Sequence, residues 1–165
     1  MSLLFLDIDG VLNSAAWLYA SDRPEGMEFL GNEHLMVSNP AAVARLNLIL
    51  SKSGAEVVIS SSWRHGFDPG RMQDILDRAG FSGKVIGATP TWMGNGNVRG
   101  DEIQAWLDDN GGRGKATENY GWPDPFVILD DDADMAHLLP KLVHTTWAHG
   151  LLDEHVEAAL GHLRP

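Results

Sequence analysis

Two aspartates stand two residues apart, where an apolar segment at residues 3–6 ends. The segment has the length of a strand, and strand alternation points Asp7 and Asp9 to the same side. Carboxylates there repel each other and resist burial, so they need a cation or a chemical task. The pattern predicts a catalytic site with one Asp as nucleophile, the other as acid/base and a hard cation between them. The alternative is a solvated Asp- and Gly-rich turn at Gly10.

Two other apolar segments also end in polar residues. The segment EVVISSSWR, which begins at Glu56, runs into three serines and Arg64. The segment PFVILDDDADM repeats the opening pattern and runs into Asp130 and Asp131. In open parallel sheets ligands bind beyond the carboxyl ends of the strands. We therefore expect the three strand ends to meet at one site.

The residue types at these strand ends favour phosphoryl chemistry. The pocket would be rich in oxygen ligands, without thiols or histidines in either acidic motif, so it should prefer Mg²⁺. A carboxylate nucleophile facing a phosphoryl group forms an aspartyl-phosphate, and Mg²⁺ would offset their repulsion. The Ser60 hydroxyl and a cation, Arg99 or Arg64, would hold the remaining phosphoryl oxygens. Either arginine could instead form a surface ion pair.

The elements that position these residues alternate between strand and helix. Five strands are predicted, at residues 3–6, from 56, at 84–88, from 126 and at 142–145. Helices are predicted from Pro40 to Gly54, from Asp68 to Gly80, from Asp101 to Gly111, at 133–139 and from Asp153. This alternation predicts an α/β fold, a three-layer Rossmann-like parallel five-stranded sheet with helices on both faces. Residues 14–38 lack a sustained period and are expected to form a flap or small hairpin insert.

Length and composition limit the other possibilities. A chain of 165 residues is expected to form one domain, residues 1–165. Cysteine is absent, the N-terminus lacks a signal-peptide pattern, and no segment has the length of a membrane span. We therefore expect a cytoplasmic protein. The net charge of −11 disfavours broad contact with a nucleic-acid backbone.

Four segments in order resemble the motifs of the haloacid dehalogenase (HAD) superfamily of phosphatases. They are LFLDIDGVLN, VVISSSWR, RGDEIQAWL and VILDDDADM, and together they span about residues 3–146. The whole pattern is similar to a small HAD branch linked with RNA-repair proteins. The resemblance implies that Asp7 is the nucleophile and that Asp9 is the acid/base, with its backbone carbonyl at the metal. It also implies that Ser60 binds the phosphoryl group.

The resemblance also suggests the metal ligands and one departure. Asp130 and Asp131 would serve Mg²⁺, with Asp134 as a further candidate. The basic residue of the third motif is usually lysine, but here it is Arg99, which presents a planar fork instead of a point charge. Lys115 is an alternative source of this positive charge.

Many members of the superfamily carry a large cap domain, but the gaps between the motifs here are too short for one. An open site suits a bulky phosphomonoester such as a nucleic-acid end or a phosphoprotein, whereas the charge favours a sugar phosphate or a nucleotide. Trp63 and Trp92 lie near the expected site, where they would either pack or stack on a base. A non-catalytic phosphate- or Mg²⁺-binding module serving a partner protein, and phosphoryl transfer to an acceptor other than water, remain as alternatives. The sequence does not indicate the oligomeric state.

Overall fold

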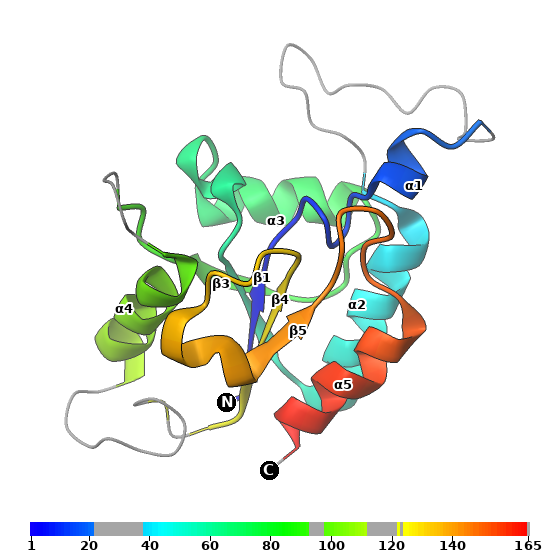
Figure 1. Ribbon diagram of the computed structural model, residues 1–165. Helices are drawn as coiled ribbons and strands as arrows, with labels where there is room; N and C mark the ends of the chain where they lie inside the picture. Colours follow the sequence, from blue (N-terminus) through cyan, green and yellow to red (C-terminus); the bar gives the residue numbers. More distant parts are fainter. Residues whose placement is uncertain (22–37, 93–97, 112–121, 123, 165) are drawn as a thin grey trace.

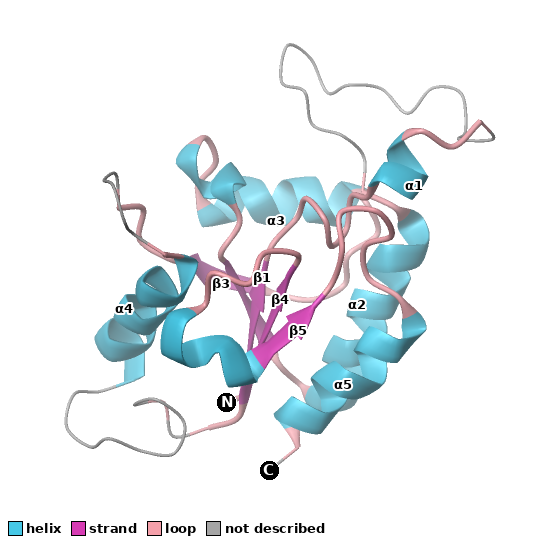
Figure 2. Ribbon diagram, viewed as in Figure 1, coloured by secondary structure: helices cyan, strands magenta, loops and turns pink. Residues whose placement is uncertain are grey.

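The computed structural model describes residues 1–21, 38–92, 98–111, 122 and 124–164. Five parallel strands form one sheet in the order β3-β2-β1-β4-β5 (Figures 1 and 2). The strands are β1 (Leu3–Leu6), β2 (Glu56–Ile59), β3 (Val85–Ala88), β4 (Phe126–Asp130) and β5 (Leu142–His144). The predicted five-stranded parallel sheet is confirmed.

Helices cover both faces of this sheet (Figure 1). They are α1 (Ala15–Leu18), α2 (Pro40–Ser53), α3 (Pro69–Arg78), α4 (Arg99–Gly111), α5 (Asp153–Leu163) and two 3₁₀ helices, η1 (Ser62–His65) and η2 (Ala136–Lys141). The buried side chains of α2, α3 and α5 pack in one cluster with one face of the sheet, and those of α4 and η2 pack with the other face. The predicted three-layer, Rossmann-like arrangement is therefore also confirmed.

The alternation of side chains along β1 determines which layer the site faces. Leu4 and Leu6 lie in the cluster beneath α2 and α5, whereas Leu3 and Phe5 lie in the cluster beneath α4. All four are fully buried, which fixes the register of the strand because a slip by one residue would exchange its two faces. Asp7 takes the next position on the side of α4.

Local signals explain the bounds of α2. The Asn39 side chain accepts a hydrogen bond from the Ala41 N–H at 3.0 Å, and Pro40 is the first helical residue. The helix ends at Gly54, which adopts the left-handed conformation with φ +67°. Pro40 and Gly54 are also the bounds predicted from the sequence for this helix.

Three elements differ from their predictions or are described only in part. The helix α4 begins at Arg99 rather than at Asp101. The short helix predicted at residues 133–139 is present but displaced: it is a 3₁₀ helix from Ala136 to Lys141. It contains Pro140, which has no backbone N–H to donate and so does not support a longer α-helix. Of the flap predicted at residues 14–38, the short helix α1 is described, and residues 22–37 lie outside the described part. No helix in the described part of the chain has the length and apolar character to span a membrane.

Candidate active site

The three polar strand ends lie side by side at one edge of the sheet. Leu6 of β1 is aligned with Ile59 of β2 and with Leu129 of β4. The residues that follow, Asp7, Ser60 and Asp130, therefore form one row across three adjacent strands. The expected convergence is confirmed, since the central strand β1 has β2 and β4 as its neighbours.

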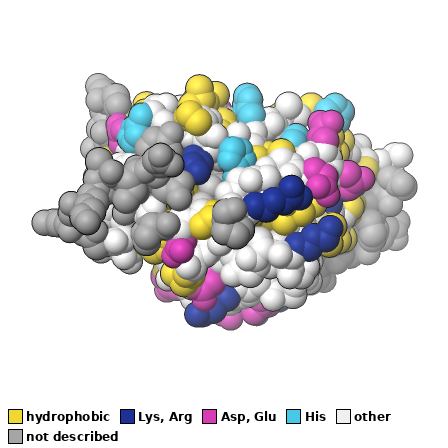
Figure 3. All heavy atoms as spheres, turned by 90° about the horizontal axis from the view of Figure 1, so that it is seen from below, with side chains coloured by type: hydrophobic (Ala, Val, Ile, Leu, Met, Phe, Trp, Pro, Cys, Tyr) yellow, Lys and Arg dark blue, Asp and Glu magenta, His cyan; other side chains and the backbone are white. Residues whose placement is uncertain are grey.

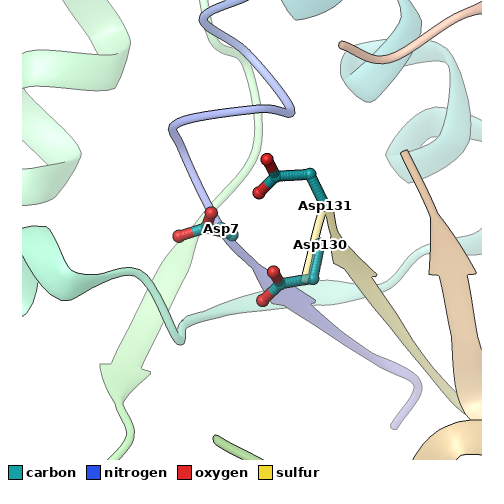
Figure 4. A group of neighbouring side chains, drawn as sticks. All are labelled: Asp7, Asp130 and Asp131. Atoms are coloured by element: carbon teal, nitrogen blue, oxygen red, sulfur yellow. The ribbon is translucent and has the colours of Figure 1, made fainter. Parts of the chain in front are cut away.

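Three carboxylates gather where β1 and β4 end (Figure 4). Asp7, Asp130 and Asp131 each offer one carboxylate oxygen, and these three oxygens all lie within 4.8 Å of one another. Asp7 and Asp130 are buried, whereas Asp131 is partly exposed. A group of hard oxygen donors with one exposed member has the chemistry of a Mg²⁺ site that also admits water and substrate oxygens.

Arg99 supplies positive charge to this group. Its Nη1 atom lies 2.9 Å from Oδ1 of Asp7 and 2.9 Å from Oδ2 of Asp130. Three carboxylates with one negative charge each and one guanidinium leave a formal charge of −2, which a divalent cation would balance. Arg99 therefore stands where the resemblance placed the basic residue of the third motif. Lys115, the alternative, lies outside the described residues.

Burial raises the pKa of all three carboxyl groups. Desolvation and the nearby Asp7 carboxylate raise the pKa of Asp130 to about 7, although Arg99 opposes the change. Desolvation also raises the pKa of Asp7, against the opposing charge of Arg99. For Asp131 desolvation acts together with the charges of Asp7 and Asp132 to raise the pKa. The folded protein thus holds these carboxylates at a cost that a bound cation would reduce.

The start of α4 is fixed against the loop that follows β4. Oδ2 of Asp134 accepts a hydrogen bond from the backbone N–H of Arg99 at 3.1 Å, and the Asp134 carbonyl accepts one from the N–H of Gly100 at 3.1 Å. A Cβ atom on Gly100 would lie 2.1 Å from the carbonyl oxygen of Met135, so only glycine permits this approach. Asp134 therefore caps α4 and lies outside the group of three carboxylates, instead of joining it as predicted.

A tight turn after β1 makes room for Asp131. Gly10 has φ +77°, and a Cβ atom there would lie 2.1 Å from Cγ of Asp131. The Thr145 hydroxyl donates to the Gly10 carbonyl at 2.7 Å, and the Thr145 N–H donates to the Asp130 carbonyl at 2.9 Å. Thr145, which the sequence analysis did not single out, therefore ties the turn to β4. Its only sequence signal is its position as the last residue of the strand predicted at residues 142–145.

Two serines after β2 border the carboxylates. The Ser60 side chain is fully buried, and its Oγ has no hydrogen-bond partner among the described residues. The Ser61 hydroxyl donates to the Asp7 carboxylate and accepts from the Trp63 N–H at 3.4 Å. A buried, unpartnered hydroxyl in the row of Asp7 and Asp130 suits a ligand oxygen, because such a group is costly to leave unpaired.

The second predicted arginine is engaged elsewhere. Arg64 forms a buried ion pair with Glu102 of α4 and donates to the backbone carbonyls of Ser60 and, at 2.7 Å, Ser61. These contacts hold the segment after β2 against α4. Of the two candidate arginines, Arg99 contacts the carboxylates, and Arg64 is bound to acceptors of the protein itself.

Asp9 lies outside the group of three carboxylates but is held firmly. Its Oδ2 accepts a hydrogen bond from the indole Nε1–H of Trp63 at 2.8 Å, and its Oδ1 accepts one from Nδ2 of Asn13 at 3.2 Å. Trp63 thus has a polar contact that neither packing nor base stacking would predict. Trp92, by contrast, is 47 % exposed, and Trp106 is buried.

Fold and site together define a HAD-type α/β domain: a parallel sheet whose central strand ends in Asp7 beside two acids from the next strand. The family model described as the HAD domain in Swiss Army Knife RNA repair proteins matches residues 3–156. The chain therefore belongs to this family, and the resemblance of the four motifs is confirmed. Neither the curated proteins nor the solved structures contain a match.

Proposed function

We propose that this protein is a Mg²⁺-dependent phosphatase that removes a terminal phosphomonoester from RNA through an aspartyl-phosphate intermediate. The observation that carries the proposal is the buried group of Asp7, Asp130 and Arg99 with Asp131 beside it. The family supports a phosphatase-type activity related to RNA repair. Our proposal goes beyond the family in three assignments: Asp7 as the nucleophile, Mg²⁺ as the metal and an RNA end as the substrate.

Asp7 and Asp9 carry out the two chemical steps of the proposed reaction. The Asp7 carboxylate attacks phosphorus while the bond from phosphorus to the leaving oxygen breaks, and the Asp9 carboxyl gives its proton to that oxygen. This step yields the free RNA hydroxyl, the phosphorylated Asp7 and the Asp9 carboxylate. A water molecule then attacks phosphorus and gives a proton to Asp9, which releases inorganic phosphate and restores Asp7.

The remaining groups bind charge. Asp7, Asp130 and Asp131 would be the principal metal ligands, together with the Asp9 backbone carbonyl. Oδ1 of Asp130 accepts a hydrogen bond from the Asp132 N–H at 2.9 Å, whereas Oδ2 lies 2.9 Å from Nη1 of Arg99 and has no hydrogen-bond partner among the described residues. When bound, Mg²⁺ neutralises negative charge and orients the phosphate relative to the nucleophile. The Ser60 hydroxyl and Arg99 bind phosphoryl oxygens.

The RNA assignment is tested by the release of inorganic phosphate. Oligoribonucleotides with a 3′- or a 5′-phosphate are compared with nucleotides and sugar phosphates, each with Mg²⁺ and with EDTA. We expect Mg²⁺-dependent release from one oligonucleotide end with the largest kcat/KM of the set, and no release by Asp7→Asn. A larger kcat/KM for nucleotides or sugar phosphates would contradict the RNA assignment but leave the phosphatase assignment intact. No hydrolysis of any substrate would contradict both and favour a binding module.

A further inference from the structure

The Asp9 carboxylate receives one hydrogen bond on each of its two oxygens. The indole N–H of Trp63 lies 2.8 Å from Oδ2, and the amide Nδ2 of Asn13 lies 3.2 Å from Oδ1. The two donors belong to separate segments, because Trp63 follows β2 whereas Asn13 closes the turn after β1. Two donors from different directions fix both the position and the rotation of a carboxyl group.

Trp63 is itself held in place. Its backbone N–H donates to the Ser61 hydroxyl that caps η1, at 3.4 Å. Its ring packs beside Phe67, with 6.4 Å between the ring centroids, and against the core cluster beneath α2 and α5. The indole nitrogen can donate a hydrogen bond but cannot accept one, so Asp9 is always the acceptor in this contact. A rigid donor of this kind limits the orientations open to Asp9.

We propose that Trp63 is a positioning residue for Asp9, which orients the acid/base toward the leaving oxygen of the substrate. The assignment rests on the proposed function, in which Asp9 transfers its proton to that oxygen as the phosphorus–oxygen bond breaks. A carboxyl oxygen has two lone-pair positions, so Oδ2 can accept from Trp63 and still have one position for its task. General acid catalysis requires the donor within hydrogen-bond reach of its target, so a loosened Asp9 transfers its proton less efficiently.

The sensitivity of kcat/KM to the leaving group separates positioning from general structural support. A 4-nitrophenolate leaves without a proton, whereas an alkoxide with its high pKa needs one. The kcat/KM value covers the steps up to departure of the leaving group, which excludes the hydrolysis of the aspartyl-phosphate. The ratio of kcat/KM for 4-nitrophenyl phosphate to that for an alkyl phosphate is also independent of the fraction of folded enzyme.

The variant Trp63→Phe keeps an aromatic ring but removes the donor. We expect it to raise this ratio by about tenfold, in the direction of Asp9→Asn but by less, since loss of the acid itself costs roughly 10²- to 10⁴-fold. Trp106→Phe is the matched control, because Trp106 packs on Phe5 in the core at 5.7 Å between centroids. It should lower stability and leave the ratio unchanged.

A second measurement does not require Trp63→Phe to fold. The indole N–H proton resonance of Trp63 should move and exchange faster in Asp9→Ala, and an unmoved resonance would overturn the assignment. An active wild type with the same ratio in Trp63→Phe would also overturn it, without affecting the proposed function. A wild type that is inactive toward both phosphates would instead overturn the proposed function and this assignment with it.

Discussion

The metal-free protein should lose stability as the pH rises, and Asp130 should cause much of the loss. Its pKa in the folded protein is about 7, against an ordinary value of 3.8. Because the folded pKa is the higher one, the folded state binds the proton more tightly than the unfolded state. The free energy of unfolding therefore falls as the pH rises from about 4 to 7. The stabilisation by the proton is complete at low pH and is lost as Asp130 ionises.

The magnitude follows from the difference between the two pKa values. A difference of about 3 pH units corresponds to about 4 kcal/mol over the full range, of which roughly 2 to 3 kcal/mol falls between pH 5 and 7.5. For a chain of this length, that corresponds to a decrease of about 5 to 10 °C in Tm. Asp7 and Asp131 act in the same direction, because their pKa values are also raised.

The assay is a series of thermal melts in EDTA from pH 5 to 7.5 at fixed ionic strength. Asp130→Asn should have a much flatter profile and should equal or exceed the wild type in stability at pH 7.5. Asp109→Asn, which removes a charge from an exposed position on α4, is the control and should follow the wild type. Parallel profiles for the wild type and Asp130→Asn would refute the reasoning, because they would show that Asp130 titrates alike in both states.

Three further predictions concern the metal and the segments around it. Mg²⁺ at about 100 times its Kd should raise the Tm of the wild type by roughly 5 to 10 °C, and that of Asp131→Asn by clearly less. Thermal melts with and without Mg²⁺ measure both shifts, and equal shifts would show that Asp131 is not a metal ligand. Gly10→Ala should lower the free energy of unfolding, measured by urea denaturation, by about 1–3 kcal/mol and should reduce the rise in Tm that Mg²⁺ causes. The reason is that residue 10 has φ +77° and that a Cβ atom there would clash with Asp131. An unchanged free energy of unfolding would show that the turn does not require glycine. Arg64→Met should lower the free energy of unfolding, measured by urea denaturation, by about 3–5 kcal/mol, because it leaves the buried Glu102 carboxylate without its partner. The double variant with Glu102→Gln should recover part of this loss. A loss below about 1 kcal/mol would contradict the buried ion pair.

The parts of the fold that depend on neighbouring residues could be predicted from the sequence. Asn39, Pro40 and Gly54 mark the two ends of α2 because each acts on backbone groups within a few positions. The row of Asp7, Ser60 and Asp130 was also predictable. Parallel strands place their carboxyl ends at one edge of the sheet, so the polar residues that follow the apolar segments are enough to locate the candidate site.

Contacts between distant segments could not be predicted. The cap of α4 comes from Asp134, which lies 35 positions after Arg99, so the helix begins earlier than its own sequence indicates. A glycine at position 100 permits a close approach, but it does not identify Met135 as the neighbour. The bond from Trp63 to Asp9 spans 54 positions, and a tryptophan in a loop gives no sign of where its N–H points.

Trapping of the intermediate tests the central claim, that Asp7 is the nucleophile of a phosphatase. The protein is mixed with Mg²⁺ and a substrate that is radiolabelled in its phosphomonoester, and the reaction is quenched in acid within the first turnover. We predict that label remains bound to the wild-type protein, is released by hydroxylamine as expected for an acyl phosphate, and is absent from Asp7→Asn. Label on Asp7→Asn, or phosphate release by that variant at the wild-type rate, would contradict the account.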